Sequence, residues 1–121
     1  MTQRVLIVED EPHIVESLTF ILCREGFEVA ALTDGEAALT ALAEAVPDVL
    51  VLDVMLPGMS GFDLLRMVRD QPALADLPVL MLTAKGQRRD REVAEAAGVS
   101  RFITKPFSNA DVVEAVKELA Q

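Results

Sequence analysis

Five polar side chains of this chain stand at or just beyond the ends of short apolar runs, where buried strands would finish. They are Glu9, Asp10, Asp53, Thr83 and Lys105. The carboxyl ends of parallel strands share one edge of a sheet, so these groups are expected to meet in one cleft. Three carboxylates against one ammonium would leave that cleft with an excess of negative charge.

Crowded carboxylates repel one another unless a cation joins them, and an incomplete set of hard oxygen ligands suits Mg²⁺. We therefore expect Asp10 and Asp53 to hold Mg²⁺ directly, with Glu9 acting through a bound water. Asp53 has the chemistry of a carboxylate nucleophile that forms an aspartyl phosphate. Lys105 would place a compact positive charge on one phosphoryl oxygen, and Thr83 would offer its hydroxyl to another.

Each of these residues has a simpler explanation when it is taken alone. An acid at a strand end is often solvated or caps the next helix, and a threonine hydroxyl often bonds to nearby backbone. The dipeptide Lys105-Pro106 is weak evidence by itself, although it could mark a cis peptide bond. Their arrangement, each at its own strand end, favours a shared site.

The elements that would position these groups alternate along the whole chain. Strands are expected over five apolar runs, at residues 5–8, 29–32, 49–52, 79–82 and 102–103. Several runs are continuous rather than alternating, which is typical of parallel strands covered on both faces. Helical spacing marks the segments 14–22, 38–46, 64–68, 88–97 and 112–119 between and after them.

Several residues indicate where these helices begin and end. Pro12 suits the first turn of the first helix, and Gly26 suits its carboxyl-terminal cap. The run Thr33–Glu36 has the form of a capping box before the second helix. Ser60 and Ser108 are cap candidates for the third and the last helix.

Five strands alternating with five helices predict a series of βαβ units with right-handed crossovers. This is a doubly wound, flavodoxin-like α/β fold whose five-stranded parallel sheet has the order 2-1-3-4-5. Ligands of such a fold bind at the carboxyl ends of strands 1 and 3. We expect one domain over residues 1–121, because no linker, repeat or low-complexity tract is visible.

Composition narrows the class of protein. Hydrophobic residues make up 51% and charged residues 26% of the chain, which is typical of a globular protein. A net charge of −9 argues against direct binding of nucleic acid. The single cysteine, Cys23, permits no internal disulfide and is expected to be a passive, core or half-buried thiol. With no signal peptide and no apolar run long enough to span a membrane, we expect a cytoplasmic protein.

Across nearly its full length the chain resembles the receiver domains of two-component response regulators. The matching stretches are VLIVEDE at 5–11, LVLDVMLPGMSG at 50–61, VLMLTAK at 79–85 and FITKPF at 102–107. As a set these motifs are highly specific, whereas a Leu-Pro-Gly or Thr-Lys-Pro alone would mean little.

The resemblance implies a role for each site residue. Asp53 would be the phosphoacceptor, Glu9 and Asp10 the acidic pair, and Met55 the donor of a backbone carbonyl to Mg²⁺. Thr83 and Lys105 match the switch hydroxyl and the phosphate-binding lysine, and Phe102 matches the aromatic residue that reorients on activation. Met55 and Lys85 are implied to tune the hydrolysis of the aspartyl phosphate.

The resemblance also implies partners. The phosphoryl donor would be a histidine on a sensor histidine kinase or a histidine phosphotransfer protein, and the output a downstream effector or a fused domain. The chain's single histidine, His13, is expected to be an exposed side chain rather than a ligand or base. Such a domain transfers phosphate to itself and slowly hydrolyses it, so it is not expected to be an enzyme with an independent substrate.

Phosphorylation is expected to pull Thr83 toward the new oxygens and to draw the loop 83–87 with it. The space that Thr83 vacates would admit the ring of Phe102 from an outward position. The fourth helix should respond most, because its alanine-rich side buries little apolar surface.

Three other functions remain possible. The chain could be the receiver half of a DNA-binding transcriptional regulator, but Ser100-Arg101 stands where many such regulators carry an acidic pair used in dimerisation, which modestly favours a stand-alone module. A flavin- or nucleotide-binding protein of this fold would need a glycine- or hydroxyl-rich loop where Glu9–Glu11 lies. A phosphatase with an aspartate nucleophile would usually carry a second aspartate where this chain has Met55.

Overall fold

The computed structural model describes residues 2–84 and 88–121, and its elements alternate as expected. The strands are β1 (Arg4–Val8), β2 (Glu28–Leu32), β3 (Val49–Asp53), β4 (Val79–Ala84) and β5 (Arg101–Lys105). The helices are α1 (Pro12–Arg24), α2 (Gly35–Glu44), α3 (Gly61–Asp70), α4 (Arg88–Ala96) and α5 (Asn109–Leu119), with a short 3-10 helix η1 (Pro72–Leu74).

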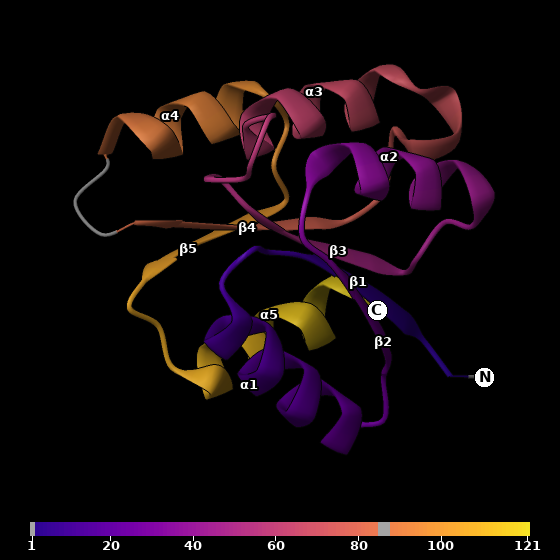
Figure 1. Ribbon diagram of the computed structural model, residues 1–121, viewed down its shortest axis with the longest axis vertical. Helices are drawn as coiled ribbons and strands as arrows, with labels where there is room; N and C mark the ends of the chain where they lie inside the picture. Colours follow the sequence, from indigo (N-terminus) through magenta and orange to yellow (C-terminus); the bar gives the residue numbers. More distant parts are fainter. Residues whose placement is uncertain (1, 85–87) are drawn as a thin grey trace.

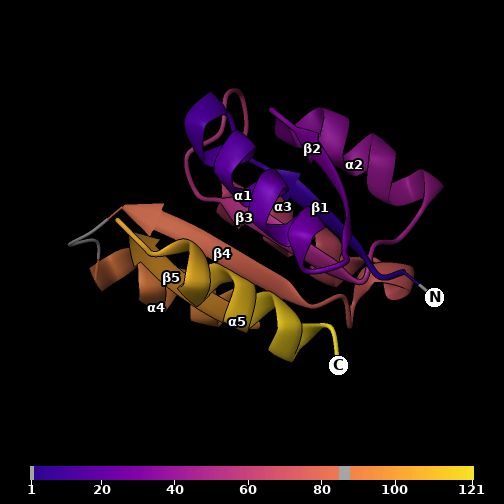
Figure 2. The ribbon, with the colours of Figure 1, turned by 90° about the horizontal axis from the view of Figure 1, so that it is seen from below.

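All five strands are parallel and lie in the order β2-β1-β3-β4-β5, which confirms the predicted doubly wound topology. The helices α2, α3 and α4 cover one face of the sheet, and α1 and α5 cover the other (Figure 1). Figure 2, seen from the side of α1 and α5, shows both of these helices in front of the strands.

The core consists of one apolar cluster on each face of the sheet. Leu50, Leu52 and Met81 pack with the helices on the α2–α4 side. Val49, Val51 and Leu82 pack with α1 and α5 on the opposite side. Alternate residues of β3 therefore enter opposite clusters, which explains why this central strand is apolar without interruption until Asp53.

The predicted helix ends are mostly confirmed. Pro12 is the first residue of α1, and Gly26 follows that helix with a φ of 94°. The Ser60 and Ser108 side chains accept hydrogen bonds from the backbone amides of Asp63 and Asp111. The expected capping box at 33–36 is wrong in register, because Asp34, not Thr33, caps α2 by accepting a hydrogen bond from the amide of Ala37 at 2.8 Å.

Three other expectations need correction. The second helix ends at Glu44, so Val46 lies beyond it and is 48% exposed instead of belonging to its apolar side. Cys23 is exposed rather than core or half-buried, because Leu18 and Leu22 carry the buried side of α1. Strand β5 is longer than its apolar run, since polar residues flank Phe102 and Ile103 in the pairing with β4.

The segment before β1, from Thr2, and the carboxyl-terminal end lie at the edge of the sheet opposite the carboxyl ends of the strands (Figures 1 and 2). The strands all run the same way, and α5 returns against them, so that its end meets the segment before β1. The side-chain amide of Gln3 donates a hydrogen bond to the carbonyl of Ala120 there. None of the helices in the part of the chain that the structure describes is both long and apolar enough to cross a membrane.

Candidate functional site

Three carboxylates gather at the carboxyl ends of β1 and β3. One oxygen from each of Glu9, Asp10 and Asp53 lies within 4.8 Å of the others. For Glu9 and Asp53 this follows from the register of the sheet, because Val8 pairs with Leu52 and an acid follows each of these two residues in the chain. The predicted convergence of these three acids is confirmed; we call them the acid cluster.

Lys105 reaches the acid cluster from the end of β5. Its Nζ donates to Glu9 Oε1 at 3.0 Å and to Asp53 Oδ1 at 3.3 Å. The Lys105–Pro106 peptide bond is cis, as the sequence suggested it could be. The ammonium thus bridges the carboxylates of Glu9 and Asp53 and neutralises part of their negative charge.

The ammonium of Lys105 alone does not neutralise the negative charge of the acid cluster. Glu9 is fully buried, and this burial, with the neighbouring Asp53 carboxylate, raises the Glu9 pKa to about 7 although Lys105 pulls it down. Burial by itself would lower the pKa of Lys105, but its hydrogen bonds and charge interactions with Glu9 and Asp53 raise that pKa overall. A further cation would let all three acids ionise.

The donor set of the acid cluster fits a hard divalent cation. Its oxygens come from two buried carboxylates and one exposed carboxylate, that of Asp10, so an ion there would keep some of its waters. Met55 lies two residues beyond Asp53, and its side chain is 73% exposed. A backbone carbonyl from Met55 as a metal ligand stays a prediction.

Thr83 lies near the end of β4, one residue beyond the partner of Asp53 in the sheet. Its side chain is buried, and its hydroxyl donates to Asp90 Oδ2 in the first turn of α4 at 3.0 Å. Asp90 was not predicted from the sequence. An acid in the first turn of the helix after β4 was the available signal, but helix caps give the same signal.

The other expected switch residue, Phe102, lies in β5 beside Met81 of β4. Phe102 is half-buried and packs against the apolar cluster on the α2–α4 side of the sheet. Residues 85–87, which are Lys85 and the rest of the expected switch loop 83–87, lie outside the described residues.

Gly61, at the start of α3, packs closely against the backbone of Asp53. A Cβ atom on Gly61 would come within 2.2 Å of the backbone oxygen of Asp53, so that any larger residue must displace the end of β3. The amide of Gly61 also donates to the carbonyl of Val54 at 2.8 Å. From the sequence this glycine was expected only as part of a motif and of a helix start, and its close contact with Asp53 was not predicted.

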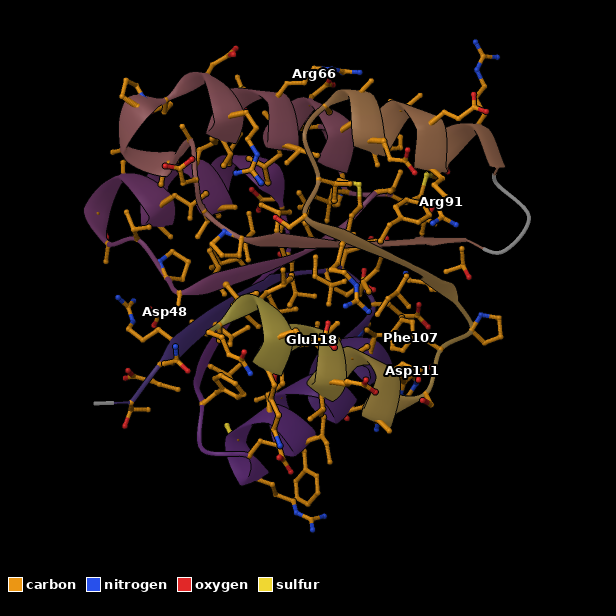
Figure 3. The ribbon with its side chains drawn as sticks, turned by 180° about the vertical axis from the view of Figure 1, so that it is seen from behind. Asp48, Arg66, Arg91, Phe107, Asp111 and Glu118 are labelled. Carbon is orange, nitrogen blue, oxygen red and sulfur yellow. The ribbon has the colours of Figure 1, made fainter. Side chains whose placement is uncertain are left out.

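A groove of 520 Å³ opens beside Lys105, between the first turns of α1 and the connection that leads into α5. Its lining includes Glu11, His13, Ile14 and Phe107. His13 is exposed, as expected. Figure 3 shows Phe107 close to Asp111, where the chain enters α5. The groove shares Lys105 with the site, and none of the three acids lines it.

The arrangement can perform one kind of chemistry well. Asp53 has a carboxylate oxygen beside an ammonium and two further acids that could hold a divalent cation. Positive charge on both sides of a carboxylate nucleophile is what transfer of a phosphoryl group requires, because that group carries negative charge throughout the reaction.

Comparison with known proteins gives a consistent family. The sequence model of the family described as "Response regulator receiver domain" matches residues 5–117. The chain is 42% identical over 117 residues to the "DNA-binding response regulator MtrA" of Mycolicibacterium smegmatis, a match covering 97% of this chain and 50% of that protein. The chain thus spans about half the length of this relative.

Solved structures agree with that result. The crystal structure of a putative response regulator from Chloroflexus aurantiacus has a TM-score of 0.95 at 36% identity, with 99% of this chain and 98% of that chain covered. The crystal structure of the Mn²⁺-bound form of response regulator Rcp1 has a TM-score of 0.83 at 25% identity, with 97% of this chain and 91% of that chain covered.

Proposed function

Because this chain belongs to the receiver domain family of two-component response regulators, we propose that it accepts a phosphoryl group on Asp53 in a Mg²⁺-dependent reaction. The observation that supports this proposal most is the acid cluster with Lys105 bridging two of its members. The donor would be a phosphohistidine on a sensor histidine kinase or on a histidine phosphotransfer protein.

In the proposed transfer, a carboxylate oxygen of Asp53 attacks the phosphorus atom. The bond from phosphorus to the donor's imidazole nitrogen breaks, its electron pair stays on that nitrogen, and an acyl phosphate forms on Asp53. Lys105, already 3.3 Å from Asp53 Oδ1, would pair with an oxygen of the arriving group. Hydrolysis by water returns inorganic phosphate and the free carboxylate, so no independent substrate is turned over.

Glu9, Asp10 and Asp53, with the backbone carbonyl of Met55, would hold Mg²⁺. The metal would supply positive charge that neutralises the transferring phosphoryl group. Support comes from the grouping of the three carboxylates, from the raised pKa of Glu9, and from the structural relative described as an Mn²⁺-bound form.

Replacement of the acceptor tests this proposal. Asp53→Asn should abolish Mg²⁺-dependent labelling by acetyl phosphate, because an amide is not a nucleophile at phosphorus. Intact-mass spectrometry would detect the added phosphoryl group in the parent protein. The control is Asp70→Asn, an exposed acid at the end of α3, which should label like the parent. Labelling of Asp53→Asn at another residue would refute the assignment.

We further propose that Thr83 and Phe102 transmit the effect of phosphorylation at Asp53 to the surface around Phe102. Thr83 would donate its hydroxyl to the phosphoryl group, and the ring of Phe102 would move into the space left behind. Thr83→Ala should therefore still label with acetyl phosphate but should lose the phosphorylation-dependent chemical-shift changes around Phe102. Unaltered shift changes in that variant, measured by NMR against the parent protein, would show that the coupling does not run through Thr83.

Residues 1–121 would form one receiver domain that acts on an effector protein in the reducing cytoplasm, without inserting into membranes or contacting nucleic acid itself. A second candidate is the receiver half of a longer DNA-binding regulator, which the half-length match to MtrA favours. Arg101, which stands where many such regulators carry an acid used in dimerisation, pairs in the described chain with Glu118 on α5. The sequence of the full-length gene would discriminate the stand-alone module from the longer DNA-binding regulator.

A further inference from the structure

The Thr83 hydroxyl is already engaged before any phosphoryl group arrives. It donates to Asp90 Oδ2 at 3.0 Å, and the threonine side chain is buried. A threonine hydroxyl has one proton, so it can donate to only one acceptor at a time. A phosphoryl oxygen on Asp53 and the Asp90 carboxylate must therefore compete for the same proton.

Two features of Asp90 strengthen its hydrogen bond from Thr83 in the unphosphorylated protein. It is the third residue of α4, where the amino-terminal end of the helix favours a negative charge. Asp90 is half-buried, and its hydrogen bond from Thr83 is charge-assisted. Among the side chains that the structure describes, Asp90 forms no ion pair, and Thr83 is its hydrogen-bond partner.

We propose that Asp90 is a positioning residue that holds the Thr83 hydroxyl on α4 and thereby opposes the phosphorylated state. This inference rests on the proposed phosphorylation of Asp53. When Thr83 turns to a phosphoryl oxygen, the half-buried Asp90 carboxylate loses its donor, which is unfavourable. Phosphorylation is thus linked to the first turn of α4 through a side chain outside the acid cluster.

The linkage is reciprocal. A hydrogen bond that stabilises one state lowers the affinity for a ligand that requires the other state, and its removal raises that affinity by the same factor. Loss of the Asp90 carboxylate should therefore tighten the binding of a phosphoryl mimic at Asp53, although Asp90 is not a member of the acid cluster. A merely structural role for Asp90 would loosen that binding or leave it unchanged.

The test uses beryllofluoride with Mg²⁺, titrated into the full chain and followed by NMR. Asp90→Ala should bind the mimic about tenfold more tightly than the parent protein, the factor expected for one charge-assisted hydrogen bond. Asp90→Asn, which keeps the size and a weaker acceptor, should show a smaller gain and covers the case in which Asp90→Ala fails to fold. Glu92→Gln, an exposed acid on the same helix, should bind like the parent.

A double-mutant cycle assigns the effect to the shared proton. In a Thr83→Val background, which removes the hydroxyl and nearly keeps the shape, Asp90→Ala should change the affinity less than twofold. An equal gain with and without the hydroxyl would overturn the inference, and so would an unchanged or weaker affinity of both Asp90 variants. Neither of those results would contradict the proposed function. The proposed function fails instead if the parent protein does not bind the mimic, or if Asp53→Asn binds it as tightly as the parent.

Discussion

Glu9 is the residue whose charge depends most on what else occupies the acid cluster. It is fully buried, and its carboxylate accepts hydrogen bonds from Lys105 and from the amide of Asp10. Its raised pKa means that the folded protein without metal keeps a proton on this group that the unfolded chain has already lost near pH 5.

This difference predicts a pH dependence of stability. From about pH 4.5 upward the folded state binds more protons at Glu9 than the unfolded state, so the contribution of Glu9 to the free energy of unfolding falls as the pH rises. The fall continues through the folded-state pKa of about 7 and ends only well above it. Urea unfolding in EDTA at a series of pH values would measure it. Mg²⁺ should reduce the fall because it favours the ionised carboxylate.

The control is Glu9→Gln, which has no proton to lose at this position. The difference in unfolding free energy between the parent and Glu9→Gln should change over this pH range in EDTA. A difference that is independent of pH would mean that Glu9 ionises as an ordinary acid does.

At the scale of single residues, the sequence predicted which side chains of the site meet, but it did not predict every contact that they make. Glu9, Asp53 and Lys105 could be placed together because each ends a strand and parallel strands end at one edge. The bond from Thr83 to Asp90 could not be predicted, because it depends on how the first turn of α4 packs beside β4. The role of Gly61 depends likewise on a close backbone contact that no residue pattern reports.

At the scale of elements, Arg69 ties the end of α3 to the segments that lead into β4 and β5. Its Nε donates to the carbonyl of Gly98 at 2.8 Å, and its Nη1 donates to the carbonyls of Leu77 at 2.7 Å and Ala75 at 3.1 Å. Its Nη2 donates to the hydroxyl of Ser100. Partial burial lowers the pKa of Arg69, and the nearby Asp76 only partly offsets this.

We expect Arg69→Ala to lower the free energy of unfolding by about 3 kcal/mol, because several carbonyls would lose a charged donor at once. Arg69→Lys should recover only part of this, since an ammonium lacks the planar fork of a guanidinium. Chemical denaturation of the purified variants measures both effects.

The matched control is Arg66→Ala, one turn earlier on the same helix and labelled in Figure 3. Arg66 is exposed and pairs only with Asp63 in the described structure, so its removal should change the free energy of unfolding by less than about 0.5 kcal/mol. Equal losses for the two variants would show that the carbonyl contacts of Arg69 add nothing.

The sequence predicted elements better than their ends. Continuous apolar runs located all five strands, because a sheet covered on both faces leaves few other arrangements. The cap of α2 was misplaced by one residue, since Thr33 and Asp34 are both good caps and only the packed helix decides between them. The short helix η1 was missed because three residues are too few to show a period.

At the scale of the whole molecule, burial is uneven. Every residue of β3 is buried, whereas Ala94 is the one fully buried residue among the described side chains of α4. Local opening should therefore be far easier in α4 than in the central strand.

Hydrogen–deuterium exchange of the unphosphorylated protein should show this contrast. Amides of α4 should exchange at least about tenfold faster than those of β3, because opening the helix exposes so little apolar surface. NMR or mass spectrometry would resolve the two segments. Equal protection of α4 and β3 would mean that the molecule opens only as one unit.

The position of the two chain ends has a practical consequence. The segment that begins at Thr2 and the carboxyl-terminal end lie at the edge of the sheet away from the acid cluster, separated from it by the length of a strand, roughly 16 Å for five residues. A sensor chip or a fluorescent reporter attached at either end would therefore leave the mouth of the cleft facing the bulk solution. Affinities measured on such immobilised protein should match those of the free protein.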